Sequence, residues 1–167
     1  MEGFKPVLFG WTTTQNLWPM IHPPLLLGWG PLCLAPRWKH TKTLTLAMPF
    51  LHGILYSSIL LPMMMMAPSP DGDAPQPDLN NMESIFRLFA NPDVFFCGWV
   101  HYLAFDLLVA RGIAQDALEV CKVSDWQYYT MVVPCLFGCF YAGPVGYVLY
   151  MVIRTLVLNS NQNNDTK

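Results

Sequence analysis

Three long stretches of this sequence contain no Asp, Glu, Lys or Arg: residues 6–36, 43–67 and 126–153. An α-helix needs about 20 apolar residues to cross the ~30 Å hydrocarbon core of a bilayer, and each stretch is long enough. A fourth apolar run, residues 92–114, contains only three charged residues, Asp93, Asp106 and Arg111. The pattern therefore predicts an all-α integral membrane protein with four transmembrane helices, at about residues 14–35, 43–66, 92–114 and 127–154.

The composition agrees with a membrane protein. Hydrophobic residues make up 53% of the chain and charged residues only 12%, whereas a soluble domain has about 25% charged residues. The formal net charge of −2 provides no basic patch for nucleic-acid binding. The length fits a single four-span domain over residues 1–158.

Prolines interrupt two of the predicted spans. A proline inside a helix removes a backbone donor and clashes with the preceding turn, so we expect the first and fourth spans to be broken or kinked. In the first span we expect neighbouring helices or water to satisfy the carbonyls that are freed. The residues concerned are Pro19, Pro23, Pro24 and Pro31 in the first span, and Pro134 and the Gly143-Pro144 pair in the fourth.

The connecting segments differ in charge. Residues 36–42 form a basic turn that contains Trp38, which is typical of a cytoplasmic-type membrane interface. The loop after the third span, with Asp116, Glu119, Lys122 and Asp125, is expected on the same side. Residues 67–91 are expected to form an acidic, proline-rich loop and, from residue 82, an interfacial amphipathic helix. The tail, residues 159–167, is expected to be disordered.

No metal or cofactor is indicated by the sequence. The five cysteines form no Cys-x-x-Cys pair, so neither a zinc site nor a complete disulfide framework is predicted. The four consecutive methionines at residues 63–66 fan around a helix, so they cannot all face one ion. We expect both groups to serve in packing or lipid contact.

The third span has polar groups that need an explanation. An Asp or Arg at the middle of a membrane helix costs ~2.5–3.5 kcal/mol on insertion scales, so such residues are functional candidates by default. His101 and Asp106 fall near the middle of the span, whereas Arg111 lies nearer its end and can extend to the interface. The structural alternative is that Asp106 and Arg111 only join helices through hydrogen bonds.

Helical geometry separates the two central groups. At ~100° per residue, Trp99, Tyr102 and Asp106 share one face, while His101 lies ~140° away from Asp106. Asp106 therefore requires a partner from another span. The sequence offers four candidates and does not choose among them: His22, His52, Tyr141 and Tyr147.

Several motifs together resemble a known family, the abscisic-acid-deficient-four or neoxanthin synthase-like membrane proteins of plastids. They cover most of the spans and are most specific in the third. The matching residues are Leu34-Ala35-Pro36 before a basic residue, Trp99, His101, Asp106-Leu107, Ala110-Arg111, Asp116, Leu118-Glu119 and Pro144-Val145-Gly146.

The resemblance implies a four-span protein that takes part in converting violaxanthin to neoxanthin, a step of xanthophyll and abscisic acid metabolism. This conversion is a redox-neutral isomerisation of an epoxide to an allene and requires a proton donor and a proton acceptor but no cofactor. Asp106 and His101 are the catalytic candidates. Trp99, Tyr102 and Arg111 are candidates for ligand binding. The plastid location follows from the resemblance alone, because no transit-peptide pattern is visible.

Two other functions remain open at this point. The chain could be a non-catalytic carotenoid- or lipid-binding membrane subunit that presents pigment to a partner enzyme, and its assembly with a partner membrane protein or as a homo-oligomer is left open. It could also be a small proton-coupled transporter in which Asp106 relays protons. The expected partners are membrane lipid and a xanthophyll ligand.

Overall fold

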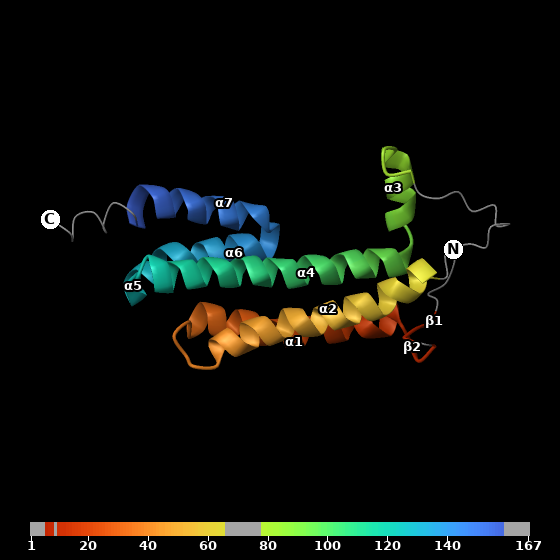
Figure 1. The fold of residues 1–167 in the computed structure, drawn as a ribbon, viewed down its shortest axis with the longest axis horizontal. Coiled ribbons are helices and arrows are strands. Elements are labelled where there is room, and N and C mark those ends of the chain that lie inside the picture. The colour runs from red at the N-terminus through yellow and green to blue at the C-terminus, as the bar shows by residue number, and fades with distance from the viewer. Residues whose placement is uncertain (1–5, 9, 66–77, 159–167) are drawn as a thin grey trace. The chain divides into compact units, whose positions relative to one another are not determined.

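The computed structural model describes residues 6–8, 10–65 and 78–158, and the described chain is almost entirely helical (Figure 1). A two-residue strand, β1 (Pro6–Val7), pairs antiparallel with β2 (Thr12–Thr13). The helices follow in the order α1 (Thr14–Leu34), α2 (Thr41–Met65), α3 (Met82–Phe89), α4 (Pro92–Gln115), α5 (Asp125–Gln127), α6 (Val133–Ala142) and α7 (Pro144–Ile153). Three π-helical segments extend this series: η1 (Asp116–Val120), η2 (Tyr128–Val132) and η3 (Arg154–Leu158).

The chain divides into two compact units. The first unit comprises Met1–Pro23 and Phe50–Tyr102, and the second comprises Pro24–Pro49 and Leu103–Lys167. The all-α class predicted from the sequence is confirmed. The number of spans is not: in the described residues, two helices are long and apolar enough to cross a membrane, α2 and the continuous helix Pro92–Val120.

Helix α1 is continuous over its 21 residues, so the first span is not broken at its prolines. Pro23 and Pro24 leave the carbonyls one turn earlier without backbone donors. In the first unit a donor from α2 reaches the adjacent carbonyl, since His52 Nε2 lies 2.8 Å from Ile21 O. Such donors from a neighbouring helix help a proline-rich helix to continue.

Within the second unit, two tyrosines of η2 cap the C-terminal end of α1. Tyr128 Oη donates to Leu32 O and Tyr129 Oη donates to Leu34 O, each at 2.9 Å. The last four carbonyls of a helix have no donors inside the helix. The two phenols therefore satisfy carbonyls that the α1 backbone leaves open.

The stretch expected to form the fourth span, residues 127–154, reverses direction at its centre. Gly143 has a φ of 44°, and α6 and α7 lie side by side as a helical hairpin on either side of it (Figure 1). The interruption expected at Gly143-Pro144 is present, but it ends one helix and starts another. No single continuous helix covers this stretch, and a fourth transmembrane helix is not confirmed.

The hairpin is packed at backbone distance through glycines. A Cβ built on Gly138 would lie 2.8 Å from Gly146 Cα, and a Cβ on Gly146 would collide with the backbone of Cys135 and Cys139. Glycine is required where two helix backbones approach this closely. The two thiols are free and fully buried in α6, which agrees with the predicted packing role.

The connection after the third span differs in part from the sequence prediction. Asp116 and Glu119 were expected in a loop, but they belong to η1, which continues the helix of α4. The predicted proximity of this connection to the basic turn is confirmed within the second unit. Arg37 pairs with Asp125 at 3.2 Å, and Lys42 pairs with Glu119 at 2.7 Å.

The predicted interfacial helix is present as α3. Asn81 caps its N-terminus by accepting a hydrogen bond from Glu83 N, and Glu83 pairs with Arg87 on its polar side at 2.6 Å. Asn91 caps α4 in the same way, accepting from Asp93 N at 2.9 Å, so the predicted helix start is confirmed. The acidic loop before residue 78 and the predicted disordered tail lie outside the described residues.

Candidate functional site

A cluster of aromatic rings joins α1 and α4 in the first unit. The Trp18 ring lies 6.3 Å from Phe95 and 5.7 Å from Trp99, and Trp99 lies 5.6 Å from Tyr102. His22 completes the cluster, because its Nε2 accepts a hydrogen bond from Trp99 Nε1 at 3.4 Å. The structure thus brings together the two predicted ligand-binding aromatics, Trp99 and Tyr102, and places them in a larger aromatic group.

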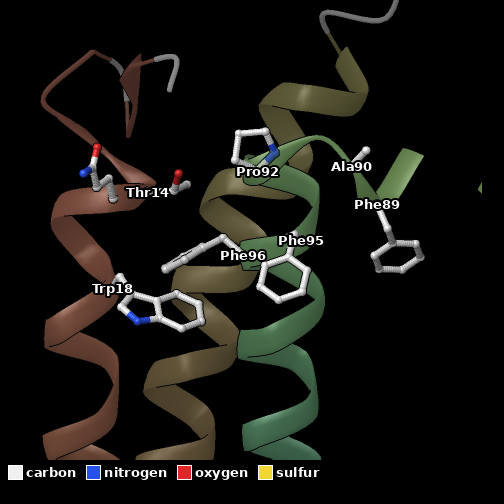
Figure 2. A pocket seen from close by; sticks show the side chains of 8 residues that line it. Thr14, Trp18, Phe89, Ala90, Pro92, Phe95 and Phe96 are labelled. Atoms are coloured by element: carbon white, nitrogen blue, oxygen red, sulfur yellow. The ribbon is translucent and has the colours of Figure 1, made fainter. Parts of the chain in front are cut away.

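A cavity of about 380 Å³ opens beside this cluster. Figure 2 shows Trp18 of α1 directed toward Phe95 and Phe96 of α4, with Phe89 of α3 on the other side of Phe95. The remaining lining residues are Thr14, Gln15, Ala90 and Pro92. The walls are therefore largely aromatic and suit a flat or cyclic apolar ligand. The sequence analysis did not identify this cavity, although the density of aromatics before Tyr102 was a visible signal.

A buried hydrogen bond lies at the helix-terminal end of the cavity. Thr14 Oγ1 donates to Asp93 Oδ1 at 2.6 Å, and both residues are buried. Asp93 stands in the first turn of α4, where the helix dipole favours a carboxylate. The pair joins the first turns of α1 and α4 and thereby fixes the helix ends that frame the cavity.

His101, the predicted proton acceptor, is an exposed residue of the first unit. Its ring lies 5.5 Å from the ring of Tyr56 on α2. Phe105 and Gly112 of the same helix are exposed as well. An exposed imidazole is accessible to a ligand that approaches α4 from outside.

Asp106, the predicted proton donor, belongs to the second unit and is only 8% exposed. Cys139 of α6 lies within electrostatic range of this carboxylate. Of the four partners considered from the sequence, His22 and His52 make hydrogen bonds within the first unit, while Tyr141 and Tyr147 of the second are exposed. Asp106 belongs to the second unit and is buried, whereas His101 belongs to the first unit and is exposed.

Arg111 is half-buried. Its Nε is fully buried and has no hydrogen-bond partner among the described residues. The side chain lines a small recess together with Thr41 and Thr45 of α2 and Gln115 of α4. The recess shares Lys42 and Glu119 with a larger cavity at the basic turn.

A polar cluster around Asp116 was not singled out as a site from the sequence. Asp116 Oδ2 accepts from Arg154 Nε at 2.6 Å and from Tyr150 Oη at 2.5 Å, and Cys121 Sγ lies 3.8 Å away. Burial raises the pKa of the Cys121 thiol, so the thiol stays protonated at neutral pH. The groups of this cluster satisfy one another, which is typical of a structural junction.

The described residues contain no group of three or more His, Cys, Asp or Glu side chains placed to hold a metal ion. The polar and aromatic groups instead provide an apolar ligand cavity, an exposed imidazole and a buried carboxylate. Proton transfer and ligand binding are the chemistry that such groups support.

Comparison with known proteins gives one match. A sequence model of the family described as ABA DEFICIENT 4-like matches residues 17–150. No curated protein and no solved structure matches the chain. The matched region contains α2, α4, α6 and nearly all of α1, and it includes every candidate residue discussed above from Trp18 onward. The family relates the chain to abscisic acid and xanthophyll metabolism, and the chain belongs to the ABA DEFICIENT 4-like family.

Proposed function

We propose that the protein acts on a xanthophyll in a membrane and takes part in the conversion of violaxanthin to neoxanthin. The observation that carries the proposal is the burial of Asp106, a carboxylic acid in one of the two helices of the described chain that are apolar and long enough to cross a bilayer. A buried ionisable group in such a helix is a functional candidate by default. Family membership supplies the substrate class.

In the proposed reaction, Asp106 protonates the epoxide oxygen and the carbon–oxygen bond opens. A base removes a proton from the adjacent polyene carbon, and the electrons of that carbon–hydrogen bond form the new double bond of the allene. His101, with its exposed ring, is the proposed base. Oxygen becomes a hydroxyl group, one proton is gained and one is lost, and the product has the mass of the substrate.

The test is incubation of the purified protein with violaxanthin, with pigment analysis by chromatography and mass. The wild type is expected to yield a pigment of equal mass. Asp106→Asn is expected to lower the rate at least ~100-fold, the usual contribution of a general acid, and His101→Gln to lower it similarly. Asp78→Asn and His40→Gln alter exposed residues of the same types and should leave the rate unchanged. Full conversion by Asp106→Asn would refute the proposed acid.

A second candidate function, pigment binding without catalysis, is favoured by the aromatic cavity of the first unit. In this case the purified protein retains violaxanthin and releases it unchanged. Trp18→Ala is expected to reduce the retained pigment, whereas Trp126→Ala, which removes an exposed indole, should not. Equal retention by both variants would show that the cavity is not the binding site.

A further inference from the structure

The basic turn of the second unit encloses a cavity of about 350 Å³ that none of the functions above uses. Four cationic side chains line it, and only one carboxylate does. The lining residues are Pro36, Arg37, Trp38, Lys39, Lys42, Leu118, Glu119 and Lys122. A concave site with such an excess of positive charge attracts anions.

The ion pairs at this site leave positive charge available. Arg37 is paired with Asp125 and Lys42 with Glu119, whereas Lys39 and Lys122 form no ion pair among the described residues. Behind Lys42 and Glu119 lies the small recess that contains the buried Nε of Arg111, a donor without a hydrogen-bond partner in the described chain. The cavity therefore offers two cations outside the ion pairs, and the adjoining recess offers the unpartnered Nε of Arg111.

Two features of the backbone also favour anion binding at this cavity. Helix α2 begins at Thr41 beside the cavity, so its N-terminal amides and dipole favour an anion there. Lys122 has a φ of 51° and follows the end of η1, in a conformation where glycine is the usual residue. A lysine in this conformation is unfavourable for the fold, and its ammonium group lines the cavity.

From these observations we propose that the cavity binds a phosphate-bearing anion, either the headgroup of an anionic phospholipid or a soluble phosphate. Arg37, Lys39 and Lys122 supply the charge at the mouth, and Arg111 supplies the inner donor. Trp38, which is half-exposed at this cavity, is a residue type that anchors at headgroup level. The site is independent of Asp106 and of the aromatic cavity.

The test measures the thermal unfolding midpoint of the full chain in neutral detergent during titration with phosphatidylglycerol or phosphatidylcholine. Phosphatidylglycerol is expected to raise the midpoint and phosphatidylcholine is not. A third titration uses inorganic phosphate, with chloride at equal ionic strength as its reference. A rise with inorganic phosphate identifies a soluble phosphate as a sufficient ligand, and a rise with the lipid alone identifies the headgroup.

Three variants separate a built site from general surface charge. Lys39→Gln is expected to weaken the response about fivefold, the equivalent of ~1 kcal/mol per basic residue near an anionic surface. Arg87→Gln removes an exposed cation of the first unit and should respond as the wild type does. Leu118→Trp keeps the charge but fills the cavity, so it should also weaken the response.

Lys122→Gly provides the sharpest result because its two effects have opposite signs. Glycine relieves the positive φ, so the variant without ligand should unfold at a higher temperature than the wild type. Its response to phosphatidylglycerol or phosphate should nevertheless be about fivefold weaker. The proposal is overturned if both lipids raise the midpoint equally, or if neither they nor phosphate raises it. It is also overturned if Leu118→Trp and Lys122→Gly respond like Arg87→Gln.

Discussion

Arg154 is bound to Asp116 by two charge-assisted hydrogen bonds, from Nε to Oδ2 at 2.6 Å and from Nη2 to Oδ1 at 3.1 Å. The pair joins the end of α7 to the end of α4 within the second unit. A single helix over residues 127–154 would carry its last residue some 40 Å from its first, at ~1.5 Å per residue. The contact therefore exists only because the chain turns back at Gly143.

Removing the charge of Asp116 should destabilise the fold. In Asp116→Asn, the guanidinium of Arg154 and the phenol of Tyr150 lose a charged acceptor, and hydrogen bonds to charged groups contribute ~1.5–3 kcal/mol each. We expect a loss of about 2 kcal/mol in the free energy of unfolding, measured by denaturant titration in detergent. Glu83→Gln breaks an ion pair in which both side chains are largely exposed and should change it by less than ~1 kcal/mol. Equal effects of the two variants would contradict the structural role of Asp116.

A methyl group on Gly146 should disrupt the α6–α7 hairpin. In Gly146→Ala the new Cβ meets the backbone of Cys135 and Cys139, so the helices must separate, at a cost of ~1–3 kcal/mol or more. Gly112→Ala is the matched control, because nothing lies within 4 Å of a Cβ at that helical position. The free energy of unfolding of this control should rise by up to ~1 kcal/mol, because alanine has a higher helix propensity than glycine. Thermal unfolding measures both changes, and a stable Gly146→Ala protein would refute the close packing.

The Tyr128 hydroxyl should contribute to the docking of η2 on the end of α1. Tyr128→Phe removes its hydrogen bond to Leu32 O and leaves a buried carbonyl unsatisfied, which costs ~1–3 kcal/mol. Tyr129 makes the same kind of bond, but it is 45% exposed, and water can replace its hydroxyl. The free energy of unfolding should therefore fall more for Tyr128→Phe than for Tyr129→Phe. The reverse order would exclude the proposed difference.

The bond between Thr14 and Asp93 should hold the helix ends that frame the aromatic cavity. Thr14→Val keeps the side-chain shape but removes the donor to a buried carboxylate, so we expect a loss of about 2 kcal/mol in unfolding free energy. Thr43→Val replaces an exposed threonine of α2 and should have little effect. Retained stability in Thr14→Val would show that Asp93 does not depend on this donor.

Local rules were sufficient for several elements. The third span was predicted to begin at about residue 92, and α4 begins at Pro92 with an Asn91 cap. The amphipathic pattern from residue 82 predicted α3. The positive-inside pattern placed the basic turn and the connection after the third span on the same side, and the Lys42–Glu119 pair joins these two segments within the second unit. Each of these predictions depends on the residue types within one segment of the chain, and a sequence shows these directly.

The candidate site was predictable only in part. Helical phase indicated that His101 and Asp106 face different directions, and in the structure one is exposed and the other buried. The aromatic cavity was not predictable, because its walls come from α1, α3 and α4. The recess at Arg111 was missed for the same reason, since Thr41 and Thr45 of α2 complete it.

The sequence by itself determined that this chain is helical and strongly apolar, because composition and periodicity act residue by residue along the backbone. Only the tertiary structure decided the path of the chain after residue 127. Hydropathy is the same for one long helix and for two short helices packed on each other. The close approach at Gly146 and the bond between Asp116 and Arg154 favour the hairpin. Both contacts require the chain to turn back, so they depend on the tertiary structure.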